Sequence, residues 1–231
     1  MKAVAVLVLV LATSSTALAG PQSTIGGKRL KSDMVHNTGV GWPSLFYEWW
    51  HRGQGNLDWA LGAELVYGDW SGAFSDVSAG LALNAPLRWH VHNRKHAKAT
   101  TDVGIRFTPG AMVGGTDRGP VPPVGVRRDQ RVMGGLRAEL AVPISIDVHD
   151  RVSVVTGATI PLTLMFAKDV DPWGIIPLLV RMGVEINAAP KVAPFFLFEL
   201  GPAIRIGNSN SNVDFAFRVW VGTAFWSVLG N

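Results

Sequence analysis

The chain has 231 residues and a formal net charge of +4, which is too small and too scattered along the sequence to indicate nucleic-acid binding. Hydrophobic residues make up 48% of the chain and charged residues only 16%, which excludes overall disorder, because disorder requires low hydrophobicity. The absence of Cys excludes disulfide scaffolds, zinc sites with Cys ligands and a lipid anchor on a cleavage-site Cys.

Residues 1–19 have the features of a secretory signal peptide. Lys2 supplies a positive start, residues 3–12 form an uncharged apolar run, and Ala17-Leu18-Ala19 is a small-x-small cleavage site. An uncleaved membrane anchor is the alternative, but a spanning helix needs about 20 apolar residues. We therefore expect export, with cleavage after Ala19.

The region from residue 57 onward divides into eight runs in which apolar residues alternate with others. Turns rich in Gly, Asp, Asn, Ser and Pro separate the runs, and no useful 3.6-residue stripe is present. We predict an all-β barrel over residues 57–231, after an N-terminal segment over residues 20–56. The predicted strands are 57–67, 75–92, 98–113, 131–148, 152–167, 175–187, 192–206 and 213–228.

The alternation separates large aliphatic side chains from charged ones. In the run 131–148, Leu136 and Leu140 share one face, whereas Arg137, Glu139 and Asp147 lie on the other. In the other runs, too, charged residues well inside a run fall opposite the large aliphatics. One face of the predicted sheet is therefore systematically uncharged.

The composition of the polar face indicates which way it points. Lysines occur only in the signal peptide, the N-terminal segment and the turns, and the polar face carries Gly, Ala, Ser, isolated Arg and acidic residues. Arg suits a confined site, because its planar guanidinium pairs with carboxylates and is weakly hydrated. We predict that the polar face lines a crowded lumen and that the apolar face contacts lipid. A soluble periplasmic lipocalin-like ligand binder, with the apolar face inside, is the alternative.

Aromatic residues and loop lengths favour the membrane interpretation. Phe215 and Phe225 lie ten residues apart on the apolar face, which corresponds to roughly 25 Å along the membrane normal at a 40° tilt. If both barrel ends are periplasmic, the short turns 93–97, 149–151 and 188–191 lie inside and the longer loop 114–130 lies outside. Short inner turns and long outer loops are typical of outer-membrane barrels.

The pattern over residues 57–228 resembles the small bacterial outer-membrane β-barrel superfamily, which includes the transmembrane domain of outer membrane protein A. The resemblance implies a closed antiparallel up-and-down transmembrane β-barrel in the outer membrane of a Gram-negative cell, inserted by the barrel-assembly machinery. Members usually end in an aromatic residue that this machinery reads. Here the last aromatics, Phe225 and Trp226, precede the end by five residues.

The number of strands depends on the N-terminal segment. We predict eight strands, with residues 20–56 in the periplasm or plugging the lumen. The alternative is ten strands, with one at residues 40–50 and another near residues 28–37, although residues 28–33 make a poor strand.

The inward charges are predicted to form a balanced polar network. We therefore expect a non-enzymatic outer-membrane protein with a structural or surface-binding role, without cofactors; a narrow, porin-like pore for small solutes is the alternative. The network comprises Glu64, Arg106, Arg137, Glu139, Arg181, Glu185, Glu199, Arg205 and Arg218.

Further hypotheses concern catalysis, metal and lipopolysaccharide. An outer-membrane lipid-modifying hydrolase needs a Ser activated by His near the outer rim, and the predicted lipid-facing positions there contain neither residue. His90 and His92, two residues apart, together with His96 are weak candidates for a metal site beside a basic turn. The loop arginines are candidates for contacting lipopolysaccharide; they are Arg118, Arg127, Arg128 and Arg131.

Overall fold

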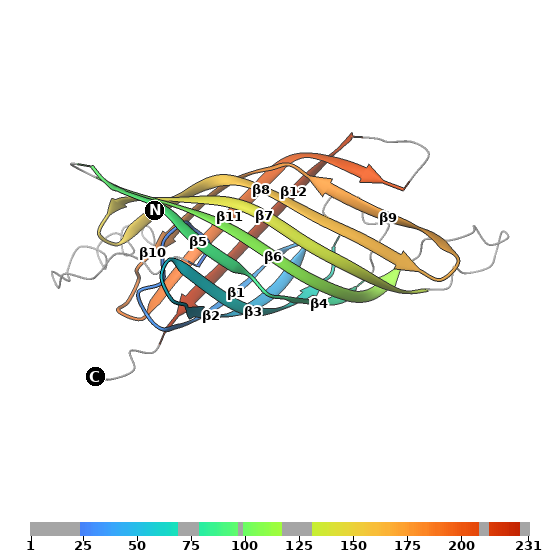
Figure 1. Ribbon diagram of the computed structural model, residues 1–231, viewed down its shortest axis with the longest axis horizontal. Helices are drawn as coiled ribbons and strands as arrows, with labels where there is room; N and C mark the ends of the chain where they lie inside the picture. Colours follow the sequence, from blue (N-terminus) through green and yellow to red (C-terminus); the bar gives the residue numbers. More distant parts are fainter. Residues whose placement is uncertain (1–23, 69–78, 97–98, 117–130, 208–212, 227–231) are drawn as a thin grey trace, which may run out of the picture.

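The computed structural model describes residues 24–68, 79–96, 99–116, 131–207 and 213–226, which form twelve β-strand segments (Figure 1). Within these residues, no helix is long and apolar enough to cross a membrane. The segments are β1 (Met34–Trp42), β2 (Ser44–Arg52), β3 (Leu57–Val66), β4 (Gly80–Asn84), β5 (Leu87–Lys95), β6 (Thr100–Thr116), β7 (Arg131–His149), β8 (Val152–Ala167), β9 (Val170–Pro177), β10 (Leu179–Ile186), β11 (Val192–Ile206) and β12 (Val213–Phe225).

The segments form a closed antiparallel barrel of ten strands. β4 and β5 are two halves of one strand between β3 and β6, and β9 and β10 are two halves of one strand between β8 and β11. Pairing continues across the first interruption, where Ala60 N–H donates to the Pro86 carbonyl at 2.8 Å. β12 pairs with β1 and closes the sheet.

The prediction of eight strands is wrong, and the ten-strand alternative is confirmed. The N-terminal segment contributes both β1 and β2, which are joined at Pro43. The strand predicted at residues 40–50 is therefore two strands, because the chain reverses at Pro43, which has no N–H for a sheet ladder. Residues 28–33 lie outside any strand, but β1 already begins at Met34.

The barrel is apolar outside and charged inside, as the alternation predicts. On β7, Leu136 is 59% exposed and Leu140 is 48% exposed. By contrast, Arg88 and Glu199 are fully buried inside. This is the inverse of a water-soluble barrel and the arrangement of a transmembrane one.

Residues 24–30, which we call the plug segment, cross the lumen at one end of the barrel. This end, where β1 begins and β12 finishes, is called the terminal end, and the opposite one the far end. The N–H groups of Thr24 and Ile25 donate to Glu185 of β10 at 3.1 and 3.3 Å. Leu30 N–H donates to Asp58 of β3 at 3.0 Å. The segment thus spans the lumen from β10 to β3.

We predict that Leu140→Arg lowers the free energy of unfolding in lipid vesicles by about 2 to 4 kcal/mol, because it places a charge near the middle of the apolar face. Val132→Arg, on the same face of β7 but near its far end, is the control, with a loss of about 1 kcal/mol or less. Urea unfolding of the two variants measures the difference. Equal losses would contradict the membrane-facing assignment.

Candidate functional site

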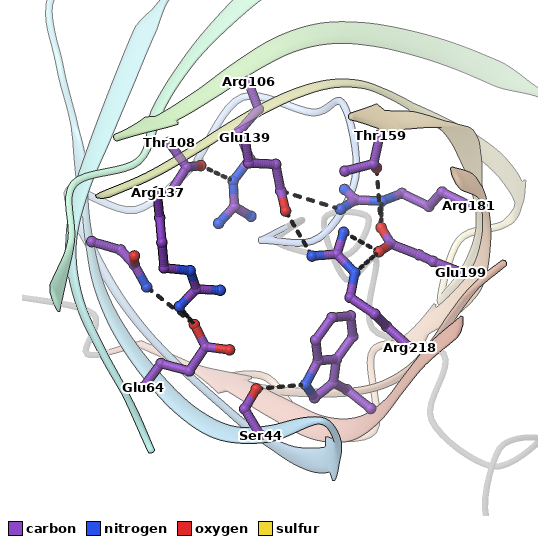
Figure 2. Close-up of polar contacts among 12 residues, drawn as sticks. Ser44, Glu64, Arg106, Thr108, Arg137, Glu139, Thr159, Arg181, Glu199 and Arg218 are labelled. Atoms are coloured by element: carbon purple, nitrogen blue, oxygen red, sulfur yellow. Dashed lines mark hydrogen bonds and ion pairs between the residues drawn. The ribbon is translucent and has the colours of Figure 1, made fainter. Parts of the chain in front are cut away.

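Eight charged side chains from seven strand segments meet in the middle of the lumen, and Figure 2 shows most of them. We call this set the charged layer. It has four guanidinium groups and four carboxylates, so its formal charges cancel. Its members are Glu48 (β2), Glu64 (β3), Arg106 (β6), Arg137 and Glu139 (β7), Arg181 (β10), Glu199 (β11) and Arg218 (β12).

Glu199 is the centre of one half of the charged layer. Its Oε1 accepts hydrogen bonds from Arg181 Nε at 2.6 Å and from the Thr159 hydroxyl at 3.1 Å. Its Oε2 accepts one from Arg218 Nε at 2.5 Å. Because Glu199 is fully buried, these contacts replace the water that an ionised carboxylate would otherwise require.

Glu139 extends this half across the lumen (Figure 2). It accepts a hydrogen bond from Arg218 Nη1 at 2.8 Å and forms an ion pair with Arg181 at 3.8 Å. The Arg218 guanidinium also lies 5.0 Å from the ring centroid of Trp220, at a distance suited to a cation–π interaction. Two arginines and two glutamates are therefore linked in one network.

The other half consists of two separate ion pairs. Glu64 pairs with Arg137 at 2.5 Å and accepts a longer hydrogen bond of 3.4 Å from the Asn84 amide. Glu48 pairs with Arg106 at 2.5 Å. Each arginine therefore faces a carboxylate from a different strand.

Glu48 is additionally held by uncharged donors. The Asn37 amide donates to its Oε2 at 3.1 Å and the Trp50 indole at 2.8 Å. The Arg106 guanidinium lies 5.3 Å from the Trp50 ring centroid, and its Nε donates to Thr108 at 3.1 Å. β2 thus supplies a member of the charged layer, and β1 supplies an amide that binds it, in addition to their part in the wall.

A cavity of about 90 Å³ lies among these side chains. Glu48, Glu64, Arg106, Arg137 and Arg218 line it, together with Ile25 of the plug segment. This space is large enough for a few water molecules.

A second set of polar groups binds the plug segment through its backbone. Arg88 donates to the Gly26 carbonyl at 3.0 Å, and Arg181 donates to the Ile25 carbonyl at 3.1 Å. Ser145 accepts a hydrogen bond from Gly27 N–H at 2.9 Å. The wall therefore holds this segment largely by main-chain groups, whose hydrogen-bonding capacity does not depend on side-chain identity.

The only lysine among residues 24–30 provides a side-chain link. Lys28 forms an ion pair with Asp147 of β7 and donates to the Ser153 hydroxyl of β8 at 2.8 Å. Across the lumen, Asp58 accepts the hydrogen bond from Leu30 N–H at the other end of the plug segment. Asp58 also accepts a hydrogen bond from Arg88 at 3.1 Å and lies 3.0 Å from His90. The plug segment is thus tied to opposite walls of the barrel.

The predicted network residues fall into three locations. Glu185 lies beside the plug segment and accepts its first two described N–H groups. Arg205 lies apart from the layer and pairs with the partly exposed Asp214. The remaining seven are in the charged layer: Glu64, Arg106, Arg137, Glu139, Arg181, Glu199 and Arg218.

The network also contains charged residues that the sequence prediction omitted. Glu48 was missed because β2 was not among the eight predicted strands, although it alternates with the outward Tyr47 and Trp49. Asp58 and Arg88 lie within the predicted runs 57–67 and 75–92, but only the structure shows that they bind the plug segment. The sequence feature that could have identified Glu48 as an inward charge is its position between two outward aromatic residues, Tyr47 and Trp49.

The three histidines considered as metal ligands do not form a site. A bulge between His90 and His92 shifts the register of β5 against β6, so the two side chains no longer share a face. His90 contacts Asp58 inside the barrel, whereas His92 is exposed, as is His96. Among the described residues, no group of three His, Cys, Asp or Glu side chains is arranged to hold a metal ion.

Comparisons with known proteins leave the role of this chain open. No protein-family model and no curated protein sequence matches it. Among solved structures, it is similar to the outer membrane protease OmpT from Escherichia coli, with 7% identity, coverage of 83% of this chain and 92% of that one, and a TM-score of 0.34. It is also similar to CarO from Acinetobacter baumannii, with 12% identity, coverage of 87% and 100%, and a TM-score of 0.27. At these scores the barrel assignment rests on the strand pairing of the chain itself.

We predict that Glu199→Gln lowers the free energy of unfolding by about 3 to 5 kcal/mol, because it leaves two buried guanidinium groups facing a neutral amide. The control is Asp214→Asn, which removes the partly exposed partner of Arg205 and costs about 1 kcal/mol or less. Denaturant unfolding of refolded protein measures both. A loss for Glu199→Gln no larger than the control's would show that the layer does not need this carboxylate.

Proposed function

We propose that this chain is a non-enzymatic outer-membrane β-barrel protein with a structural or surface-binding role, and not a conducting pore. The observation that carries the proposal is the lumen, in which paired charges fill the middle and the plug segment crosses the terminal end. In both places the polar groups of the wall are bound to one another or to the plug segment, so they are not available to a solute that passes through the lumen. The apolar exterior and the predicted signal peptide support placement in the outer membrane.

The plug segment fits its position too closely to be an incidental contact. A Cβ on Gly27 would lie 2.5 Å from the Pro143 carbonyl oxygen and 2.6 Å from that of Asp102. Only glycine allows the backbone to approach both strands at this distance. Ile25 and Leu30 flank it and pack in buried apolar clusters against the wall.

Surface binding is proposed for the far end, where lipopolysaccharide would lie if the terminal end is periplasmic. Arg131 begins β7 at this end, and its guanidinium donates to the Lys168 carbonyl at 2.7 Å. Arg118, Arg127 and Arg128 belong to the same candidate set but lie outside the described residues. Arg131 and Lys168 are thus neighbours at the rim, and their cationic side chains are of the kind that bind the phosphates of an anionic lipid headgroup.

We predict that the purified protein gives no steady ion conductance in planar bilayers, because both obstructions remain in place. Gly27→Val forces the plug segment away from β6 and β7 and removes one of the two obstructions, so brief discrete conductance steps are expected while the charged layer still limits the current. Gly134→Val is the matched control, since a Cβ on Gly134 meets nothing within 4 Å, and it should stay silent. Steady conductance of the unaltered protein would overturn the proposal and support the narrow pore.

A further inference from the structure

A group of buried apolar side chains lies at the far end of the lumen. It differs from the charged layer in the middle of the lumen, which consists of Arg and Glu side chains. Met112 of β6, Met133 of β7 and Met165 of β8 are 0 to 8% exposed. They belong to one cluster with Trp173 of β9. We call these four residues the methionine cluster. The other buried apolar clusters of the described residues contain no methionine, so the grouping of three thioethers here requires an explanation.

The strand register brings the three methionines around a single glycine. Gly135 of β7 lies directly opposite Met112 on one side and Met165 on the other. Met133 precedes Gly135 by two residues on the same strand and therefore shares its face. Trp173 lies opposite Met165 and completes the row on β9.

The missing side chain of Gly135 leaves room for a sulfur atom. A Cβ at Gly135 would lie 2.9 Å from Met112 Cγ and 3.4 Å from Met112 Sδ. The Met112 thioether therefore lies over Gly135, in the same buried cluster as Met133 and Met165. Side chains directly opposite each other on antiparallel strands have Cβ atoms about 5 Å apart, which is within the reach of a methionine thioether.

We propose that the methionine cluster is a binding site for a soft monovalent cation, Cu(I), with Ag(I) as its redox-stable equivalent. Thioether sulfur is a soft ligand that selects Cu(I) over the harder divalent ions. Trp173, opposite Met165 on β9, adds an aromatic ring to the cluster, and such rings attract cations over their faces. No proton or electron is transferred in binding. The site is separate from the proposed structural role and does not depend on it.

Methionine also fills irregular gaps in apolar cores, so packing alone must be distinguished from ligation. Leucine has nearly the same volume and is tolerated in such positions, but it has no sulfur. The chain offers an internal control in Met182, which is 49% exposed on the outer face of β10. A cation site requires the inward methionines and is indifferent to Met182.

The test is equilibrium dialysis of the full mature chain, refolded in detergent, against Ag(I) in chloride-free buffer with excess imidazole to mask histidine sites. We expect one tightly bound Ag(I) per barrel. The triple variant Met112→Leu, Met133→Leu and Met165→Leu should bind it at least tenfold more weakly. Met182→Leu should bind it like the unaltered protein. Retained electrophoretic heat-modifiability shows that each variant still forms a barrel.

A second measurement identifies the ligand atoms independently of any variant. X-ray absorption of the Cu(I)-loaded protein should show a sulfur shell, and Gly135→Ala, which displaces the Met112 thioether, should weaken binding several-fold. No Ag(I) binding, equal binding by the triple variant, an equal loss in Met182→Leu, or a shell of nitrogen and oxygen only would each overturn the site.

Discussion

Closure of the backbone is the constraint on which the rest of this structure depends. Within a bilayer no water is available to unpaired N–H and C=O groups, so a sheet must return to its own first strand. Here β12 pairs with β1 from His36 to Trp42, and the circuit contains ten strands. An eight-stranded barrel is just filled by its own side chains, and diameter grows with strand number. The two strands contributed by the N-terminal segment therefore create the space that the plug segment and the cavity occupy.

The wider lumen is filled in layers, each by a different interaction. At the terminal end, wall side chains bind the backbone of the plug segment. In the middle, paired Arg and Glu side chains cancel one another, since isolated buried ions would cost several kcal/mol each. At the far end, the methionine cluster packs as an apolar group, with the Met112 thioether over Gly135. A polar network in such confinement stabilises the fold only when every member is satisfied, which explains why Glu199 accepts three donors.

The period-two pattern was sufficient to predict the barrel and the inward face of its charges. Leu136 and Leu140 lie outside and Arg137 between them lies inside, because a strand alternates whatever its tertiary partners are. The strand number was not predictable in this way. β1 and β2 have nine residues each and reverse at Pro43, so the region resembled one strand without a partner. A short strand contains few repeats of the apolar–polar alternation, so the pattern of residues 34–52 was weak.

Local exceptions to alternation were also hidden in the sequence. The bulge in β5 places His90 and His92 on different faces. A bulge depends on hydrogen bonding with the neighbouring strand, so it cannot be predicted from the alternation within one run of residues. Pro86 similarly divides a predicted run, 75–92, into β4 and β5. The pairings of the charged layer join residues far apart in the chain, as with Glu48 and Arg106. Alternation shows that such charges face inward. Which charges form pairs is decided by the order and register of the strands in the closed barrel.

Two glycines show how the absence of a side chain determines what fills the lumen. At Gly27 the bare backbone approaches the carbonyls of β6 and β7, so the plug segment is held by main-chain groups. At Gly135 the wall itself is bare, and the Met112 thioether occupies the vacant position. In both places the informative residue has no side chain, so a search for charged or catalytic side chains passes over it. The contacts of the lumen follow as much from where side chains are missing as from where charges are placed.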